Sequence, residues 1–141
     1  MNRESITQIR EKLDNREISS LELFEYFKER IEKYDKELNS FITTDFEKAE
    51  AAAKAADELI AKGEQKSLTG IPIAHKDLLC TEGLLTTAAS QMLSNFIPPY
   101  NATVVDKMAQ LGAVSLGKLN LDEFAMGSTG ETSYYGVSRN P

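Results

Sequence analysis

The chain has 141 residues, of which 41% are hydrophobic and 27% charged, so it is long enough for one domain with its own core. Its formal net charge of −6 and isoelectric point near 4.9 argue against a nucleic-acid-binding surface, because phosphate binding needs clustered lysine and arginine. No apolar run reaches the roughly 18 residues of a transmembrane helix, and the N-terminus lacks the apolar stretch of a secretory signal. With a single cysteine and no export signal, the expected location is a reducing cytoplasm.

Charge and turn residues divide the chain into two regions. Most of the charged side chains lie in residues 1–66, whereas residues 67–141 contain most of the glycines and all four prolines. We therefore expect solvated helices in the first region, and strands and turns close to a core in the second.

Three helices are predicted in residues 1–66. Ser5–Gln8 and Ser19–Glu22 each match a capping box, in which a serine and a residue three positions later cap each other. Thr44–Glu47 begins the third helix, and Gly63 is its expected end. The second helix carries an apolar stripe that we expect to pack in the core, formed by Phe24, Phe27, Ile31 and Tyr34.

A strand–helix–strand unit is predicted in the second region, after a short strand at 41–42. Its first strand is Ile71–Lys76, its helix runs from about 102 to 111, and its second strand is Ala113–Leu119. A crossover of this kind makes the two strands parallel. The segment Leu78–Asn101 is long for a connection in a compact domain, which is typical of a functional loop.

Lys76 is the first candidate for chemistry, because it ends an apolar strand. Burial disfavours the ammonium form, and a neutral amine is a base. Strand alternation places Lys76 on one face with Pro72 and Ala74, and His75 on the other face with Asp77. From this pattern alone, two interpretations stay open: a catalytic base, or a structural lysine paired with a carboxylate.

His75 and Cys80 are the only histidine and the only cysteine, so a Cys–His nucleophile pair is the obvious alternative. In a continuous strand their spacing puts them on opposite faces, which disfavours the pair and favours a buried, inert Cys80. A metal site built from His75, Asp77 and Cys80 lacks further ligands, so no metal is expected.

The segment after the second strand, Asn120–Ser133, is predicted to be a short helical turn followed by a small-residue loop. Asp122 lies near the start of the turn, where the helix dipole favours an anion. The backbone of Gly127–Gly130 can approach a ligand closely, although no lysine follows as in a phosphate-binding loop. A ligand-binding loop and a plain surface turn both fit this composition.

Two segments carry a family resemblance. Leu68–Asp77 (LTGIPIAHKD) resembles the lysine motif of the amidase signature family. Thr103–Ser128 resembles, more specifically, the A-subunit family of glutamyl-tRNA(Gln)/aspartyl-tRNA(Asn) amidotransferases, with DEFAMGS at its end as the most specific part. The resemblance implies a partial amidase signature fold of α/β class. It comprises N-terminal helices (1–66), then the first strands of a mixed central sheet with crossover helices (67–141), and it ends before the serine motifs of the family.

The resemblance also implies a mechanism. Members of the family hydrolyse amides with a Ser–cis-Ser–Lys triad, and Lys76 matches the lysine. Met126, Gly127 and Ser128 match positions near the glutamine pocket. No Gly-Gly-Ser-Ser-Gly-Gly motif occurs in the chain, so the 141 residues alone are expected to be inactive. Three positions depart from the common family residues, namely His75, Leu119 and Gly130.

For the complete protein, the resemblance implies glutamine hydrolysis that supplies ammonia for converting Glu-tRNA(Gln) to Gln-tRNA(Gln), or Asp-tRNA(Asn) to Asn-tRNA(Asn). The implied partners are amidotransferase subunits B and C, glutamine and mischarged tRNA, with no membrane. No cofactor is expected in this chain, because ATP and Mg are used by the partner subunit. Two alternatives remain: a general amidase of the same superfamily, and a non-catalytic truncated paralogue that acts as a binding module.

Overall fold

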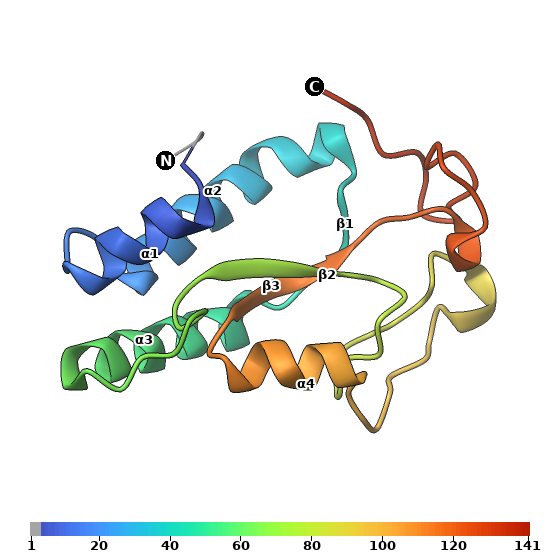
Figure 1. Ribbon diagram of the computed structural model, residues 1–141. Helices are drawn as coiled ribbons and strands as arrows, with labels where there is room; N and C mark the ends of the chain where they lie inside the picture. The colour runs from blue at the N-terminus through green and yellow to red at the C-terminus, as the bar shows by residue number, and fades with distance from the viewer. Residues whose placement is uncertain (1–3) are drawn as a thin grey trace.

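The computed structural model describes residues 4–141, which form a three-stranded mixed sheet with helices on both sides (Figure 1). The α/β architecture expected from the sequence is confirmed. In chain order the elements are α1 (Ile6–Asp14), α2 (Ser20–Leu38), β1 (Phe41–Thr44), α3 (Phe46–Lys62), β2 (Pro72–Lys76), the 3-10 helix η1 (Gln91–Leu93), α4 (Thr103–Gln110), β3 (Val114–Leu119) and the 3-10 helix η2 (Glu123–Ala125). In Figure 1, α2 runs above the sheet and α4 below it, and α3 packs against both α2 and β3.

Local capping interactions explain where the first helices begin and end. The amide of Gln8 donates to Ser5 Oγ at 3.2 Å, and the amide of Ser5 donates to Gln8 Oε1 at 2.8 Å. The same reciprocal pair joins Ser19 and Glu22 at 3.0 and 2.8 Å. Gly63 ends α3 with a left-handed backbone at φ 72°. Both predicted capping boxes and the predicted helix end are therefore confirmed.

The apolar stripe of α2 divides into two parts. Phe24 is fully buried and packs with Ala49 and Ala53 of α3 and with Val114 of β3. Tyr34, near the end of the same helix, is 40% exposed. Phe27 and Ile31 are partly buried against the same cluster, so the expectation of core packing is wrong only for Tyr34, at the end of α2 that rises away from the sheet (Figure 1).

The strand order is β1–β3–β2, with β3 in the centre. β2 and β3 pair in parallel through the α4 crossover, as predicted, and β1 pairs antiparallel to β3. Because β1 comes from residues 1–66, the two regions distinguished by composition share a single sheet.

A β-bulge in the centre of the sheet changes which face the end of β3 presents. Ser115 pairs with Ile73, but Lys118 pairs with His75, so β3 advances one residue more than β2. Gly117 lies within this extra step at φ 149°. The bulge moves the Lys118 side chain to the face of the sheet that also carries His75. Bulges of this kind often occur next to functional sites.

Replacing Gly117 with alanine is expected to destabilise the fold by about 3 kcal/mol or more, because the new Cβ would overlap the carbonyl oxygen of Thr43 and the backbone is strained for any L-residue. Gly63→Ala is the matched control, since it also has positive φ but nothing within 4 Å. That control should cost about 1 kcal/mol. Urea unfolding monitored by circular dichroism measures both, and equal losses would contradict a special role for the bulge.

Candidate functional site

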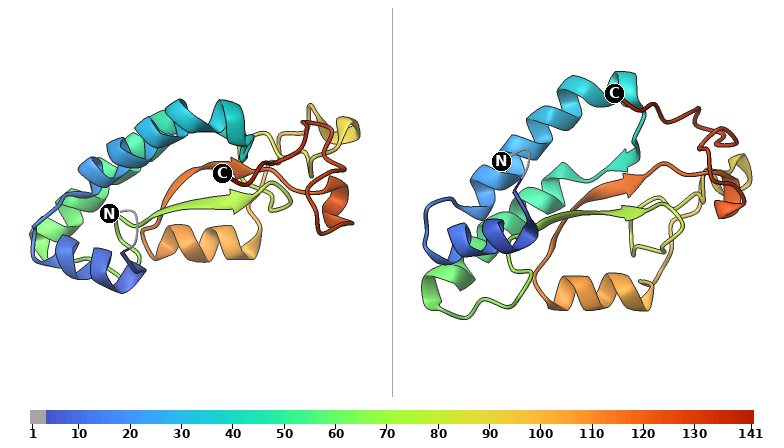
Figure 2. Two further views of the ribbon diagram at one scale, coloured as in Figure 1. Left: turned by 90° about the horizontal axis from the view of Figure 1, so that it is seen from above. Right: turned by 45° about the horizontal axis from the view of Figure 1, so that its top comes forward.

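The loops of the molecule gather at one end of the sheet. β2 and β3 both point toward that end, where residues 78–101 and 120–138 lie side by side in both views of Figure 2. In α/β sheets, ligands bind outside the carboxyl ends of the parallel strands. The candidates from sequence analysis, Lys76 and Met126–Ser128, follow or end these two strands, so this end of the sheet is the candidate site.

Lys76 is the last residue of β2, which is an edge strand of the sheet. Its neighbours His75 and Asp77 are buried, but Lys76 itself is exposed, and its side chain makes no hydrogen bond or ion pair within residues 4–141. The expected burial of Lys76 is therefore wrong for this chain. The described residues do not provide the desolvation that would favour a neutral amine.

The buried lysine of the site is Lys118, which the β3 bulge directs inward. Its side chain and that of Asp77 are both 0% exposed, and Lys118 Nζ lies 3.2 Å from Asp77 Oδ1. Nζ also donates to the carbonyl oxygen of Leu79 and to Thr86 Oγ1, both at 2.7 Å. Burial lowers the pKa of Lys118, and the charge of Asp77 opposes this effect.

Asp77 connects both strand ends to the long loop. Its Oδ2 accepts hydrogen bonds from the amide and the hydroxyl of Thr87, at 2.8 and 2.5 Å. Its backbone carbonyl accepts from the amide of Ala88 at 2.9 Å, and its own amide donates to Leu119 of β3 at 3.0 Å. The ion pair and these bonds hold residues 78–90 against the carboxyl ends of β2 and β3.

Strained backbone adjoins the ion pair. Four non-glycine residues of the two loops have φ between 51° and 58°, namely Ala88, Ala89, Phe124 and Ala125. The amide of Phe124 donates to the carbonyl of Ala88, and that of Tyr134 donates to the carbonyl of Ala89, both at 2.9 Å. Left-handed backbone is unfavourable for these residues and tends to cluster at functional sites, where the surrounding structure enforces it.

Asp122 organises the small-residue loop that follows η2. Its carboxylate accepts hydrogen bonds from the amides of Thr129, Gly130 and Thr132 at 2.9–3.1 Å, and from the Thr132 hydroxyl. The Gly130 amide has the largest effect in lowering the pKa of the Asp122 carboxyl, followed by the Thr132 amide. Asp122 is the N-cap residue of η2, as expected from its place at the start of the turn, but its side chain makes no capping hydrogen bond and binds the loop instead. A Cβ at Gly127 would lie 2.6 Å from Asp122 Cγ, which explains the glycine.

The three predicted substrate-binding residues, Met126, Gly127 and Ser128, are exposed in this loop, Met126 to 82%. They lie at the same end of the sheet as Lys76, but no hydrogen bond or ion pair joins them to it in the part of the chain that the structure describes. Their role in binding substrate stays a prediction.

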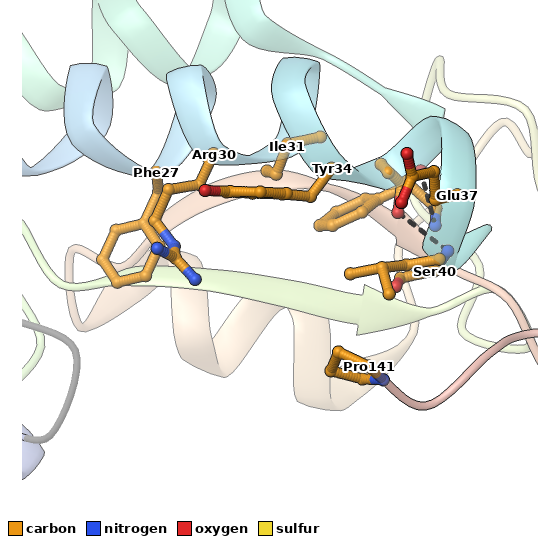
Figure 3. A pocket seen from close by; sticks show the side chains of 10 residues that line it. Phe27, Arg30, Ile31, Tyr34, Glu37, Ser40 and Pro141 are labelled. Carbon is orange, nitrogen blue, oxygen red and sulfur yellow. Dashed lines mark hydrogen bonds between the residues drawn. The ribbon is translucent and has the colours of Figure 1, made fainter.

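A cavity of about 400 Å³ lies elsewhere, along the second half of α2 (Figure 3). Phe27, Ile31 and Tyr34 line it from the helix, with Phe41 of β1 and Pro141 on its other sides. Lys76 does not line this cavity, so the hollow beside α2 and the candidate chemistry are separate.

The alternatives based on Cys80 gain no support. Its Sγ lies 3.9 Å from the hydroxyl of Tyr100, and no hydrogen bond to His75 occurs among residues 4–141. Over the same residues there is no group of three or more His, Cys, Asp or Glu side chains arranged to hold a metal ion.

None of the described helices is both long and apolar enough to cross a bilayer.

Sequence reasoning missed Lys118 and the loop residues that surround it. One signal was available, because a glycine inside a strand pattern, here Gly117, often marks a bulge. A bulge reverses the face of every later residue in the strand. A bulge at Gly117 therefore predicts that Lys118 lies on the same face of the sheet as Asp77.

The comparisons with known proteins agree with the fold. The family model described as Amidase matches residues 22–141. The A subunit of the glutamyl-tRNA(Gln) amidotransferase of Moraxella catarrhalis is 57% identical over 97% of this chain, and that of Marinomonas sp. (strain MWYL1) is 56% identical over 98%. Each alignment spans 28% of the relative, so the chain corresponds to less than a third of these proteins.

Solved structures extend the similarity to other proteins. Peptide amidase from Stenotrophomonas maltophilia superposes with a TM-score of 0.89 at 27% identity, over 98% of this chain and 30% of its own. A protein from a vestigial complex linked to the origins of an s-triazine catabolic enzyme reaches a TM-score of 0.93 at 35% identity, over 98% and 31%.

Removing the buried ammonium should be far more costly than removing an exposed one. Lys118→Met leaves Asp77 charged and unpaired, and is expected to lower the unfolding free energy by about 3–5 kcal/mol. Lys54→Met, which breaks the exposed pair with Glu50, should change it far less, because solvent screens an exposed pair. Adding Asp77→Asn to Lys118→Met should recover part of the loss, because asparagine can still accept from Thr87 without a charge. Urea unfolding tests this order, and similar losses for the two lysines would contradict it.

His75 should make the fold sensitive to mild acid. It is 7% exposed, and burial, followed by the charge of Lys118, lowers the pKa of its imidazole from 6.5. Below about pH 6.5 the unfolded chain therefore binds a proton that the folded chain resists, so stability falls as pH decreases, by up to about 1.4 kcal/mol per unit. Unfolding free energies measured from about pH 7.5 to about pH 5 should show this slope. His75→Gln should remove it, and a slope that persists in the variant would assign it to other groups.

Proposed function

Because the chain belongs to the amidase family, we propose that it is the N-terminal part of the glutaminase subunit of a tRNA-dependent amidotransferase. The observation that carries this proposal is the 57% identity to an amidotransferase A-subunit relative across 97% of the chain. Identity to the peptide amidase is only 27%, which favours the amidotransferase branch over a general amidase.

In the proposed reaction, Lys76 is the general base. It accepts a proton from a bridging serine, which in turn accepts one from the serine that attacks the glutamine amide. Both serines belong to motifs that do not occur in these 141 residues. Two features support Lys76 in this role: its position at the carboxyl end of β2, and its rigid attachment between the buried residues His75 and Asp77.

The exposed position of Lys76 defines what the rest of the protein must contribute. A neutral amine requires a dry environment, and an attacking serine requires donors for the developing oxyanion. The amidotransferase relatives are more than three times as long as this chain, since the alignment covers 28% of each. We propose that the additional segments of such a protein cover the Lys76 face of β2 and bring the two serines to it.

The proposed partners follow from the same assignment. Ammonia released from glutamine would be used by amidotransferase subunits B and C to amidate mischarged tRNA, with ATP and Mg bound by the partner subunit. Met126, Gly127 and Ser128 would border the glutamine pocket from the loop that Asp122 holds in place. No cofactor is proposed for this chain.

The direct test is a chimera in which residues 1–141 replace the matching part of the Moraxella catarrhalis relative, assembled with the other amidotransferase subunits of that organism. Glutamate release from glutamine should be retained, and Lys76→Ala should lower kcat by about 10²- to 10⁴-fold, the usual contribution of a general base. Lys107→Ala, an exposed lysine of α4, is the matched control and should leave kcat essentially unchanged.

Two results would contradict the proposal. If the chimera with Lys76→Ala keeps its glutaminase activity, Lys76 is not the base. If the chimera hydrolyses small amides but glutamine turnover does not respond to mischarged tRNA, a general amidase is the better assignment. The 141-residue chain alone should show no turnover that depends on Lys76, because it has no nucleophile in a matching motif.

A further inference from the structure

Two asparagine side chains hold the last residues of the chain against the end of α2. Asn39 Nδ2 donates to the carbonyl of Tyr135 at 2.9 Å, and the Asn39 carbonyl accepts from Ser138 Oγ at 3.1 Å. Asn120, just after β3, donates to the carbonyls of Asn39 and Gly136 at 3.1 and 3.0 Å. This asparagine clamp explains why the C-terminus lies beside the end of α2 in both views of Figure 2.

The clamp leads the chain to the cavity of about 400 Å³ beside α2. The amide of Arg139 donates to the carbonyl of Leu38, the last residue of α2, at 2.8 Å, and Pro141 lines the cavity (Figure 3). Phe27 and Ile31 form an apolar wall of the cavity, and both are only partly buried. A residue bonded to Pro141 therefore starts at the edge of this cavity.

Charged side chains at the cavity are already engaged with neighbours. The Asp35 carboxylate accepts from the amides of Ser40 and Phe41 at 2.8 and 3.2 Å. The Arg30 guanidinium lies 5.4 Å from the centre of the Tyr34 ring, which is a cation–π contact. The surface left for an occupant is therefore mainly apolar, and exposed apolar hollows mark places where another segment or molecule packs.

We propose that, in the complete protein, the residues directly after Pro141 pack their apolar side chains into this cavity, against Phe27 and Ile31. The existence of those residues rests on the proposed function, in which the chain is the N-terminal part of a protein more than three times as long. Docking within one chain is favoured over docking of another molecule. The reason is that the clamp holds Pro141 at the cavity, which raises the local concentration of whatever follows it.

The docked segment would lie on the side of the sheet that carries Lys76. His75 lines a smaller cavity together with Val105 of α4, and strand alternation puts Lys76 on the opposite face of β2. α2 lies across the sheet from α4 (Figure 1). The cavity beside α2 takes no part in the chemistry, but it would fix the start of the segment that the proposed mechanism must bring to Lys76.

The test compares the 141-residue chain with a version extended by the residues that follow the matching position in the Moraxella catarrhalis relative. About 12 residues are sufficient, because they can reach up to about 40 Å. Docking should raise the urea midpoint of unfolding by about 0.5 M or more, since it buries apolar surface only in the folded state. NMR should also show contacts between the extension and the Tyr34 ring.

Variants of the cavity wall locate the source of this gain. Ile31→Asn, which makes the wall polar, should abolish the gain in midpoint, and Tyr34→Ala should reduce it by about half or more. Each gain is the difference between the extended and unextended forms of one variant, so the cost of the substitution to the fold itself cancels. Tyr26→Ala is the matched control and should keep the full gain, because Tyr26 lies on α2 but does not line this cavity.

Three results would overturn the proposal: no gain from the extension, an equal gain from a scrambled extension of the same composition, or a full gain in both Ile31→Asn and Tyr34→Ala. If Ile31→Asn does not fold, Tyr34→Ala alone decides. The proposed function fails separately. A chimera whose glutaminase activity depends on Lys76, with no gain from the extension, would refute only the docking. A gain that follows the cavity wall, with no glutaminase activity in the chimera, would refute only the function.

Discussion

The arrangement of this protein depends on one buried ion pair. Asp77 and Lys118 are completely removed from solvent, and desolvating two charges is costly unless their remaining hydrogen-bonding capacity is used. Here Lys118 also bonds to Leu79 and Thr86, and Asp77 to both donors of Thr87. These partners all lie in the loop after β2, whereas Lys118 belongs to β3. The ion pair and its hydrogen bonds therefore form only when β2, β3 and this loop have come together.

This constraint explains how an exposed lysine can still be accurately placed. His75 and Asp77 are fixed in the interior on either side of Lys76, and the amide of Asp77 is bonded to β3. The backbone of Lys76 is therefore rigid although its amine is in solvent. Under the proposed function, the covering segments would supply the desolvation and the hydroxyl groups. This chain would fix the backbone from which the amine extends, and the covering segments would determine its protonation state.

Most of the fold could be predicted from the sequence because its signals are local. Ser5 and Ser19 cap their own helices within one turn, Gly63 ends α3, and the crossover before β3 follows from apolar periodicity. The errors concern interactions between distant segments. The inward turn of Lys118 depends on the register between β2 and β3, so alternation along β3 alone could not show it. The exposure of Lys76 depends on which surfaces cover β2, and a motif does not encode that.

The most direct measurement is NMR of the lysine side-chain nitrogens in uniformly ¹⁵N-labelled protein at neutral pH. An ammonium held by Asp77, Leu79 and Thr86 should exchange its protons slowly and give an observable Nζ–H correlation for Lys118, whereas Lys76 should give none. A protected signal from Lys76 with rapid exchange at Lys118 would contradict the account, because the interior position would then belong to the other lysine.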